Sequence, residues 1–212
     1  MEGDTPSFLG LIDNGLNAYR RADWGGWGGR YIFRQTPIWT QGGGRVTSQD
    51  KVGEHISDQA TIWRWREEFQ NEFAARMDWT IHDFAHANHN PVVTVNSQAG
   101  TAVFQIEAKI GEAVTLDASH SKDPDKGQKL SFQWFDYQEA GSTGNNLAAV
   151  TLPASATSAK IVITPTAACR PQWLPGRGTC QGSGIAHIIL KVTDNGTPTL
   201  TSYRRIILTV RP

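Results

Sequence analysis

The sequence has no excess of charge of either sign, since its 212 residues include 20 Lys+Arg and 20 Asp+Glu. Broad electrostatic binding to nucleic acid or to anionic lipid depends on a surplus of positive side chains. Long apolar runs are also missing, because no window approaches the roughly 20 apolar residues that a membrane-spanning helix needs. We therefore expect a globular chain with no nucleic-acid partner and no membrane partner.

The N-terminus lacks a secretory leader. Residues 1–6, Met-Glu-Gly-Asp-Thr-Pro, contain neither the basic segment nor the apolar segment of a signal peptide. They also lack an ordinary domain opening, because a dense motif begins at residue 2. We expect the chain to begin inside a larger protein, whose full-length form would be secreted or periplasmic.

Cysteine is scarce, with only Cys169 and Cys180 in the chain. They flank a short segment rich in Gly and Pro, so they allow one disulfide in an oxidising compartment and would stay thiols in the cytosol. No CxxC and no paired Cys/His spacing surrounds them, which argues against a zinc site.

The familiar motifs of catalytic sites are absent. Residues 182–184, Gly-Ser-Gly, lack the spacing of a nucleophile elbow, and residues 42–45 lack the Lys-Ser/Thr of a phosphate-binding loop. His82 and His86 have the spacing of a His-Glu-x-x-His zinc motif. However, Asp83 replaces the Glu and would misplace a general base by one methylene. We expect no metal site in this chain.

The composition changes near residue 90. Six of the eight Trp lie before this point, where the formal charge is −3, whereas the remainder carries +3 and is rich in Val, Ile, Thr and Ser. Residues 88–91, Asn-His-Asn-Pro, favour a turn, since Asn tolerates turn conformations and the residue before Pro avoids helix. The sequence therefore predicts two parts, residues 1–88 and 89–212.

Residues 58–79 have the pattern of a helix. Apolar side chains recur at spacings of three and four and would form one face: Ile62, Trp65, Phe69, Phe73 and Met77. Side chains of this size must pack on something. Residues 1–54 are rich in Gly and predict little regular structure to receive them, which indicates a missing partner domain.

The second part has the pattern of β-strands. Short segments rich in β-branched and aromatic residues are separated by turn clusters. Within 130–137 the alternation puts Phe132 and Trp134 on the same face. Six or seven strands in about 120 residues suit an immunoglobulin-like sandwich. The expected strands are 92–95, 113–116, 130–137, 160–163, 187–192 and 203–210.

Several motifs are specific enough to indicate a protein family. They are residues 2–9, 14–17, 24–31, 60–66, 73–79 and 87–91. Together they resemble a family of bacterial and fungal proteins described as cellulose-binding, whose members join an N-terminal nucleoside-hydrolase-like α/β domain to a C-terminal immunoglobulin-like domain. Segments of the second part, such as 114–119 and 192–198, resemble that C-terminal domain but also other sandwich modules.

The resemblance implies a fold, but this sequence lacks one feature of nucleoside hydrolases. It predicts a mainly β chain, with an immunoglobulin-like β-sandwich at residues 89–212. Residues 1–88, including helix 58–79, would be the loop-rich and helical C-terminal remnant of the α/β domain. Nucleoside hydrolases carry an aspartate cluster that binds calcium and activates water, and no such run occurs here. We therefore expect no cofactor, with calcium only in a full-length form.

The Trp and Gly residues at 24–31 are the best carbohydrate-binding candidates. Exposed rings of Trp24 and Trp27 would stack on pyranose rings, with Arg30 beside them. The alternative is that both Trp are buried and the Gly residues permit close backbone approach.

The resemblance adds three pocket-lining candidates, Glu2, Asp4 and Asn14. In the family, the opening segment closes the α/β domain near its pocket, so Glu2 and Asp4 would bind sugar hydroxyls or a cation. Their alternative role is to cap a short helix.

These observations favour a carbohydrate-associated accessory protein or fragment without catalytic activity. Its expected partners are a polysaccharide such as cellulose and the missing N-terminal α/β domain. Two alternatives stay open. A full-length form would be a glycosyl hydrolase acting on N-glycosyl or related bonds, or the sandwich would be a structural spacer.

Overall fold

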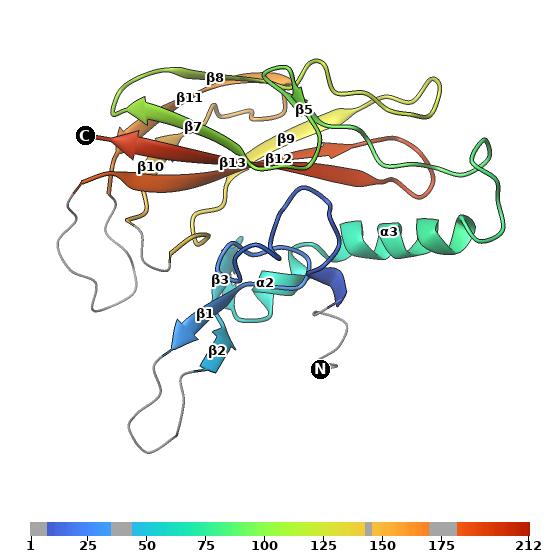
Figure 1. The fold of residues 1–212 in the computed structure, drawn as a ribbon, viewed down its shortest axis with the longest axis horizontal. Helices are drawn as coiled ribbons and strands as arrows, with labels where there is room; N and C mark the ends of the chain where they lie inside the picture. Colours follow the sequence, from blue (N-terminus) through green and yellow to red (C-terminus); the bar gives the residue numbers. More distant parts are fainter. Residues whose placement is uncertain (1–7, 35–43, 143–145, 170–181) are drawn as a thin grey trace.

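The computed structural model describes residues 8–34, 44–142, 146–169 and 182–212. The fold is mainly β, with two facing sheets from the second half of the chain and the first half packed beneath them (Figure 1). One sheet has the order β7-β13-β12-β9 and the other β10-β11-β8. The strands are β7 (Phe104–Lys109), β8 (Val114–Asp117), β9 (Ser131–Asp136), β10 (Ala149–Thr151), β11 (Lys160–Ala167), β12 (Gly184–Thr193) and β13 (Thr201–Arg211).

The core between the sheets is filled by alternate residues of each strand, as a pleated backbone requires. Strand β12 pairs with β13 antiparallel along its whole length, and β7 adds to β13 in parallel. Phe132 and Trp134 both pack in this core, which confirms their predicted common face. The fully buried aliphatic residues here include Val95, Leu116, Ile163, Ile188, Leu190, Val192, Ile206, Leu208 and Val210.

The outer face of the four-stranded sheet is also buried. Its aromatic and aliphatic side chains meet Leu16, Trp27 and Trp65 from the first half of the chain. Strands covered on both faces have nearly continuous apolar sequences, and this explains why β12 and β13 alternate so weakly. The sheet residues in this second core are Tyr137, Ile189 and Tyr203, with Phe135 packed against them.

The first half consists of short elements. Two hairpins, β1 (Tyr31–Arg34) with β2 (Gly44–Thr47) and β3 (Asp50–Val52) with β4 (His55–Ser57), precede the helices α2 (Ala60–Trp63) and α3 (Arg66–Asp78). A further small pair, β5 (Thr94–Val95) with β6 (Gln98–Ala99), follows them. In the part of the chain that the structure describes, none of the helices combines the length and the apolar character of a membrane span.

The backbone of the first half is joined directly to the sheet. The N–H of Tyr203 donates to the carbonyl oxygen of Asn14 at 2.8 Å. Gly15 has a φ of +93°, and a Cβ there would lie 1.8 Å from the Tyr203 carbonyl oxygen. Only glycine permits so close an approach. The two parts that the sequence predicts are therefore packed as neighbours through a shared core.

The prediction of one continuous helix over residues 58–79 is wrong. The structure has α2 and α3, separated at Arg64 and Trp65, where Trp65 leaves the helical conformation (φ −109°, ψ 10°). Trp65 is buried in the second core, and Arg64 reaches a buried carboxylate on β3. The interruption allows both side chains to reach these partners.

The prediction that one apolar face of this helix is buried is also wrong for the second half of the segment. Trp65 and Phe69 pack in the second core, but Phe73 is 63% exposed and Met77 is 50% exposed. The side of α3 that is buried carries Glu72 and Ala75 instead. Polar contacts explain this orientation, because Glu68 pairs with Lys191 and Asn71 donates to Thr199.

The predicted strands are all present, although their ends differ by a few residues. The prediction lacked the short strands β1–β4 and β6, and also β7 and β10, because β7 (Phe-Gln-Ile-Glu-Ala-Lys) contains polar residues and Ala, and β10 is only three residues long. Cys169 is disulfide-bonded, and Cys180 lies outside the described residues.

A buried cation lies under the second core. Arg205 of β13 is fully buried and donates to the carbonyl oxygens of Leu16 (2.6 Å) and Gly25 (2.8 Å) and to Nδ1 of His187 (2.8 Å). A guanidinium only donates, so Nδ1 is the acceptor and the imidazole proton sits on Nε2. Burial lowers the pKa of Arg205 to about 10. Burial, together with the charge of Arg205, holds the pKa of His187 well below 6.5.

We expect acid to destabilise the protein through His187. Below about pH 6.5 the unfolded chain protonates this residue and the folded chain does not, so the free energy of unfolding falls by up to about 1.4 kcal/mol per pH unit. Above that pH the contribution is intact. His187→Asn keeps an acceptor for Arg205 but does not titrate, and urea unfolding from pH 7.5 to 5 should show a shallower slope. The exposed His120→Asn is the control; an unchanged slope in His187→Asn would contradict the prediction.

Candidate functional site

A groove of about 550 Å³ lies where the first residues of the described chain, the second half of α3 and the sandwich meet. The lining residues come from segments that are distant in sequence. They are Phe8, Leu11, Ile12, Asp13, Asn14, Glu72, Arg76, Trp79, Asn90, Thr101 and Ser202.

One part of the lining is polar. Glu72 is buried, and its two carboxylate oxygens accept from Arg76 (2.6 Å) and from Asn90 (2.8 Å). The exposed Asp13 accepts from the Thr101 hydroxyl at 3.0 Å. The groove therefore presents carboxylate, amide and hydroxyl groups that can exchange hydrogen bonds with a polar ligand.

The other part of the lining is apolar. Phe8 is 58% exposed and Leu11 is 72% exposed, so both present free surface at this groove. Trp79 is half-buried, and its indole N–H donates to the Asn88 carbonyl oxygen at 2.7 Å. Arg76 lies over the Trp79 ring, with its guanidinium carbon 5.5 Å from the ring centre.

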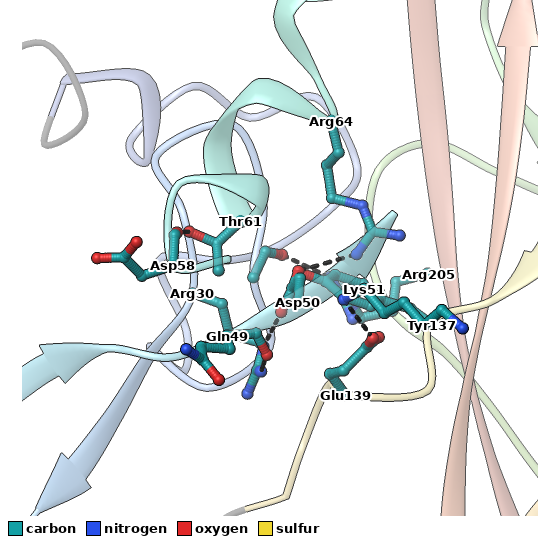
Figure 2. Close-up of polar contacts among 11 residues, drawn as sticks. Arg30, Gln49, Asp50, Lys51, Asp58, Thr61, Arg64, Tyr137, Glu139 and Arg205 are labelled. Atoms are coloured by element: carbon teal, nitrogen blue, oxygen red, sulfur yellow. Dashed lines mark hydrogen bonds and ion pairs between the residues drawn. The ribbon is translucent and has the colours of Figure 1, made fainter. Parts of the chain in front are cut away.

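A second polar cluster centres on Asp50, which is fully buried on β3 (Figure 2). Its carboxylate accepts from Arg30 Nε at 2.7 Å, from an Nη atom of Arg64 at 2.8 Å and from the Tyr137 hydroxyl at 2.6 Å. A further hydrogen bond runs from Arg30 to the Gln49 carbonyl oxygen. The cluster joins the Gly-rich loop, β3, the break between the helices and the end of β9.

The cluster around Asp50 is a closed structural unit. Burial, followed by the charge of Asp50, raises the pKa of Tyr137 well above its ordinary value, so the phenol remains a donor. Burial by itself lowers the pKa of Arg64, but its interactions with neighbouring groups, among them the charge and the hydrogen bond of Asp50, outweigh burial and the pKa is raised. Every group here has a fixed partner, so the arrangement suits a junction between elements better than a reaction.

The structure has Trp24 and Trp27 buried, 9% and 1% exposed. Trp27 donates to the Tyr203 hydroxyl at 3.3 Å, and Trp24 meets the edge of His187. A Cβ on Gly25 would lie 2.3 Å from the Tyr137 hydroxyl. The burial alternative therefore describes these residues, and neither ring presents a face on which a sugar could stack.

The remaining candidates separate into three groups. Arg30 is 3% exposed and held by Asp50, so it is not available to a ligand. Asn14 lines the groove, and its side-chain oxygen accepts from the N–H of Leu16 at 3.0 Å. Glu2 and Asp4 lie outside the described residues.

Sequence reasoning missed Asp50, Glu72 and Arg205. A signal existed for Arg205, because Arg204 and Arg205 interrupt an otherwise apolar strand and a buried charge needs a partner. Glu72 and Asp50 had no such signal, since each stands among other polar residues. Among the described residues, no group of three or more His, Cys, Asp or Glu could hold a metal ion.

We expect Asp50→Asn to lower the free energy of unfolding by about 3–5 kcal/mol, because it removes the paired carboxylate of the buried Arg30 and of the partly buried Arg64. Urea unfolding measures this. Glu107→Gln, which breaks the exposed Arg211–Glu107 pair, is the control and should stay within about 0.5 kcal/mol of the wild type. Equal effects of the two substitutions would refute the assigned role of Asp50.

Comparison with protein families finds two matches. The family described as "Cellulose-binding protein Sde0182, C-terminal domain" matches residues 113–210, which contain most of the two sheets. The family described as "Cellulose-binding Sde182, nucleoside hydrolase-like domain" matches residues 1–31, which end at the start of β1. No curated protein matches the sequence significantly.

Comparison with solved structures finds a nucleoside hydrolase-related hypothetical protein from Saccharophagus degradans that is associated with carbohydrate metabolism. It is 32% identical with a TM-score of 0.70, and the match covers 100% of this chain and 48% of that one. The chain thus spans about half the length of this relative. Mouse clustered PcdhgC3 EC1-3 is 18% identical over 61% of this chain and 35% of that one, and its TM-score of 0.29 supports no argument.

The two family matches follow one another along the chain, and one solved relative covers them both. The chain is therefore similar to the cellulose-binding proteins described as Sde0182, to their C-terminal domain over residues 113–210 and to their nucleoside hydrolase-like domain over residues 1–31.

Proposed function

We propose that this chain is a polysaccharide-binding accessory part of its family, without catalytic activity of its own, and that it binds a glucan such as cellulose in the groove beside α3. The observation that carries the proposal is the lining of that groove, in which exposed apolar side chains and hydrogen-bonding groups face one space. The description of the family as cellulose-binding supports the choice of ligand.

A sugar ring has the two kinds of surface that the groove offers. Its axial C–H groups form an apolar face, which Leu11 and Phe8 can cover, and its equatorial hydroxyls both donate and accept. Asp13 can accept from such hydroxyls, and Arg76 can donate to them. Ligand sites of this kind combine apolar contact with a few placed polar groups.

The state of Glu72 supports a binding role over a hydrolytic one. Glycoside hydrolysis requires two carboxyl groups, one of which gives a proton to the leaving group. Both oxygens of Glu72 accept hydrogen bonds, one of them from the cationic Arg76. Asp13 is then the one groove carboxylate among the described residues that faces solvent.

The disulfide at Cys169 supports an oxidising location. Disulfides persist in the periplasm and outside the cell and are rare in the cytosol. Insoluble polysaccharide is also met outside the cytosol, so the proposed ligand and the proposed location agree.

Retention on microcrystalline cellulose tests the proposal, with cellohexaose titration as the quantitative measurement. Leu11→Ala/Asp13→Ala should weaken binding about tenfold, because one apolar contact and one hydrogen bond together contribute about 1.4 kcal/mol. The matched control is Val162→Ala/Lys160→Ala on β11, which removes an aliphatic and a charged side chain from the exposed face of the other sheet.

Two further outcomes separate the alternatives. Trp27→Phe should change stability but leave the affinity of the folded protein unaltered, because Trp27 is buried away from solvent. If the wild type is neither retained on cellulose nor bound to cellohexaose, the proposal fails and the sandwich is better described as a structural spacer.

A further inference from the structure

The outward side of α3 carries Phe73 and Met77, and Ile81 follows them in the turn after the helix; these three residues are called the apolar stripe. They are spaced four apart in sequence, and the turn is held by the N–H groups of Ile81 and His82, which both donate to the Asp78 carbonyl oxygen. Their exposed fractions are 63%, 50% and 76%. Soluble proteins seldom leave a contiguous run of large apolar side chains uncovered, and such patches mark interaction surfaces.

The stripe cannot be buried by rotating α3. The opposite side of the helix is fixed to the sandwich by three polar contacts, Glu68 with Lys191, Asn71 with Thr199, and Glu72 with Asn90. Turning the stripe inward would break all three contacts. The apolar stripe is therefore held outward, where a partner from outside the described fold can cover it.

We infer that this stripe is the docking surface for a nucleoside hydrolase-like α/β domain. The match to that domain covers residues 1–31, and the solved relative is about twice as long as this chain. The described part of that match begins at Phe8, which lines the same groove as Arg76 and Trp79 of the α3 region. A nucleoside hydrolase-like domain that continues this segment would meet α3 on the side that the sandwich leaves open.

The side chains of the stripe indicate the kind of surface that the α/β domain would present to it. An aromatic ring, a thioether and an aliphatic side chain in a row fit a shallow apolar groove, as an amphipathic helix fits its receptor. Arg66 and Glu67 are exposed on the same helix and would form a polar rim. The inference does not depend on carbohydrate binding, because the stripe residues are not among those that line the groove.

The test compares this chain alone with a fusion that carries the nucleoside hydrolase-like part of the Saccharophagus degradans relative ahead of Met1. Met77→Cys is introduced in both, and its maleimide labelling rate is measured. The rate should fall by an order of magnitude or more in the fusion, because the side chain becomes covered. Val162→Cys on β11 is the control and should label equally in both. Equal labelling of Met77→Cys in the two proteins would overturn the inference.

A second measurement compares the stability of the same two proteins without a cysteine label. Phe73→Ser/Met77→Ser should leave the melting temperature of this chain unchanged, since both side chains are exposed, and should lower that of the fusion. Sedimentation of the chain alone tests whether a second copy of this chain covers the stripe, and we expect a monomer. A dimer that Phe73→Ser abolishes would show that a second copy covers the stripe, and the inference would be wrong. Neither result alters the cellulose assay, so the two proposals fail separately.

Discussion

The arrangement of this protein depends on a β-sheet that is buried on both of its faces. The four-stranded sheet uses one face for the sandwich core and fills the other with Tyr137, Ile189 and Tyr203. If that second face met water, its aromatic and aliphatic side chains would lose most of the free energy that their burial provides. The first half of the chain is therefore part of the same hydrophobic structure, even though its sequence reads as a separate piece.

This constraint decides what the Trp- and Gly-rich loop does. Arg205 is buried in the sheet, and the backbone carbonyl oxygens of Leu16 and Gly25 accept its hydrogen bonds. A buried guanidinium needs such acceptors close at hand. The loop must then approach the sheet more closely than a side chain would permit, which is why glycines stand there. Trp24 lies over Arg205 and so completes a buried site.

The sequence was informative where a residue's role depends on its immediate neighbours. Alternation and β-branched residues were sufficient to locate β9, β11, β12 and β13, and the shared face of Phe132 and Trp134 followed from period two alone. The orientation of α3 could not be found in this way. Phe73 and Met77 have the spacing of a core face, but the polar residues on the opposite side find partners on distant strands, such as Lys191 and Thr199. Periodicity shows which residues share a helix face but does not show whether that face packs on the core or faces solvent.

The same limit applies to the candidate site. The groove exists because Asp13, Glu72 and Thr101, far apart in sequence, converge at a junction of three segments. The Trp- and Gly-rich motif predicted sugar stacking on Trp24 and Trp27. Both rings are buried, however, and a buried ring has no free face on which a sugar can stack. Ligand sites are common at boundaries between folded units. Here the groove and the apolar stripe share one helix, because Glu72 and Arg76 line the groove while Phe73 and Met77 are exposed. Binding in the groove and packing on the stripe would then stabilise the same arrangement of α3.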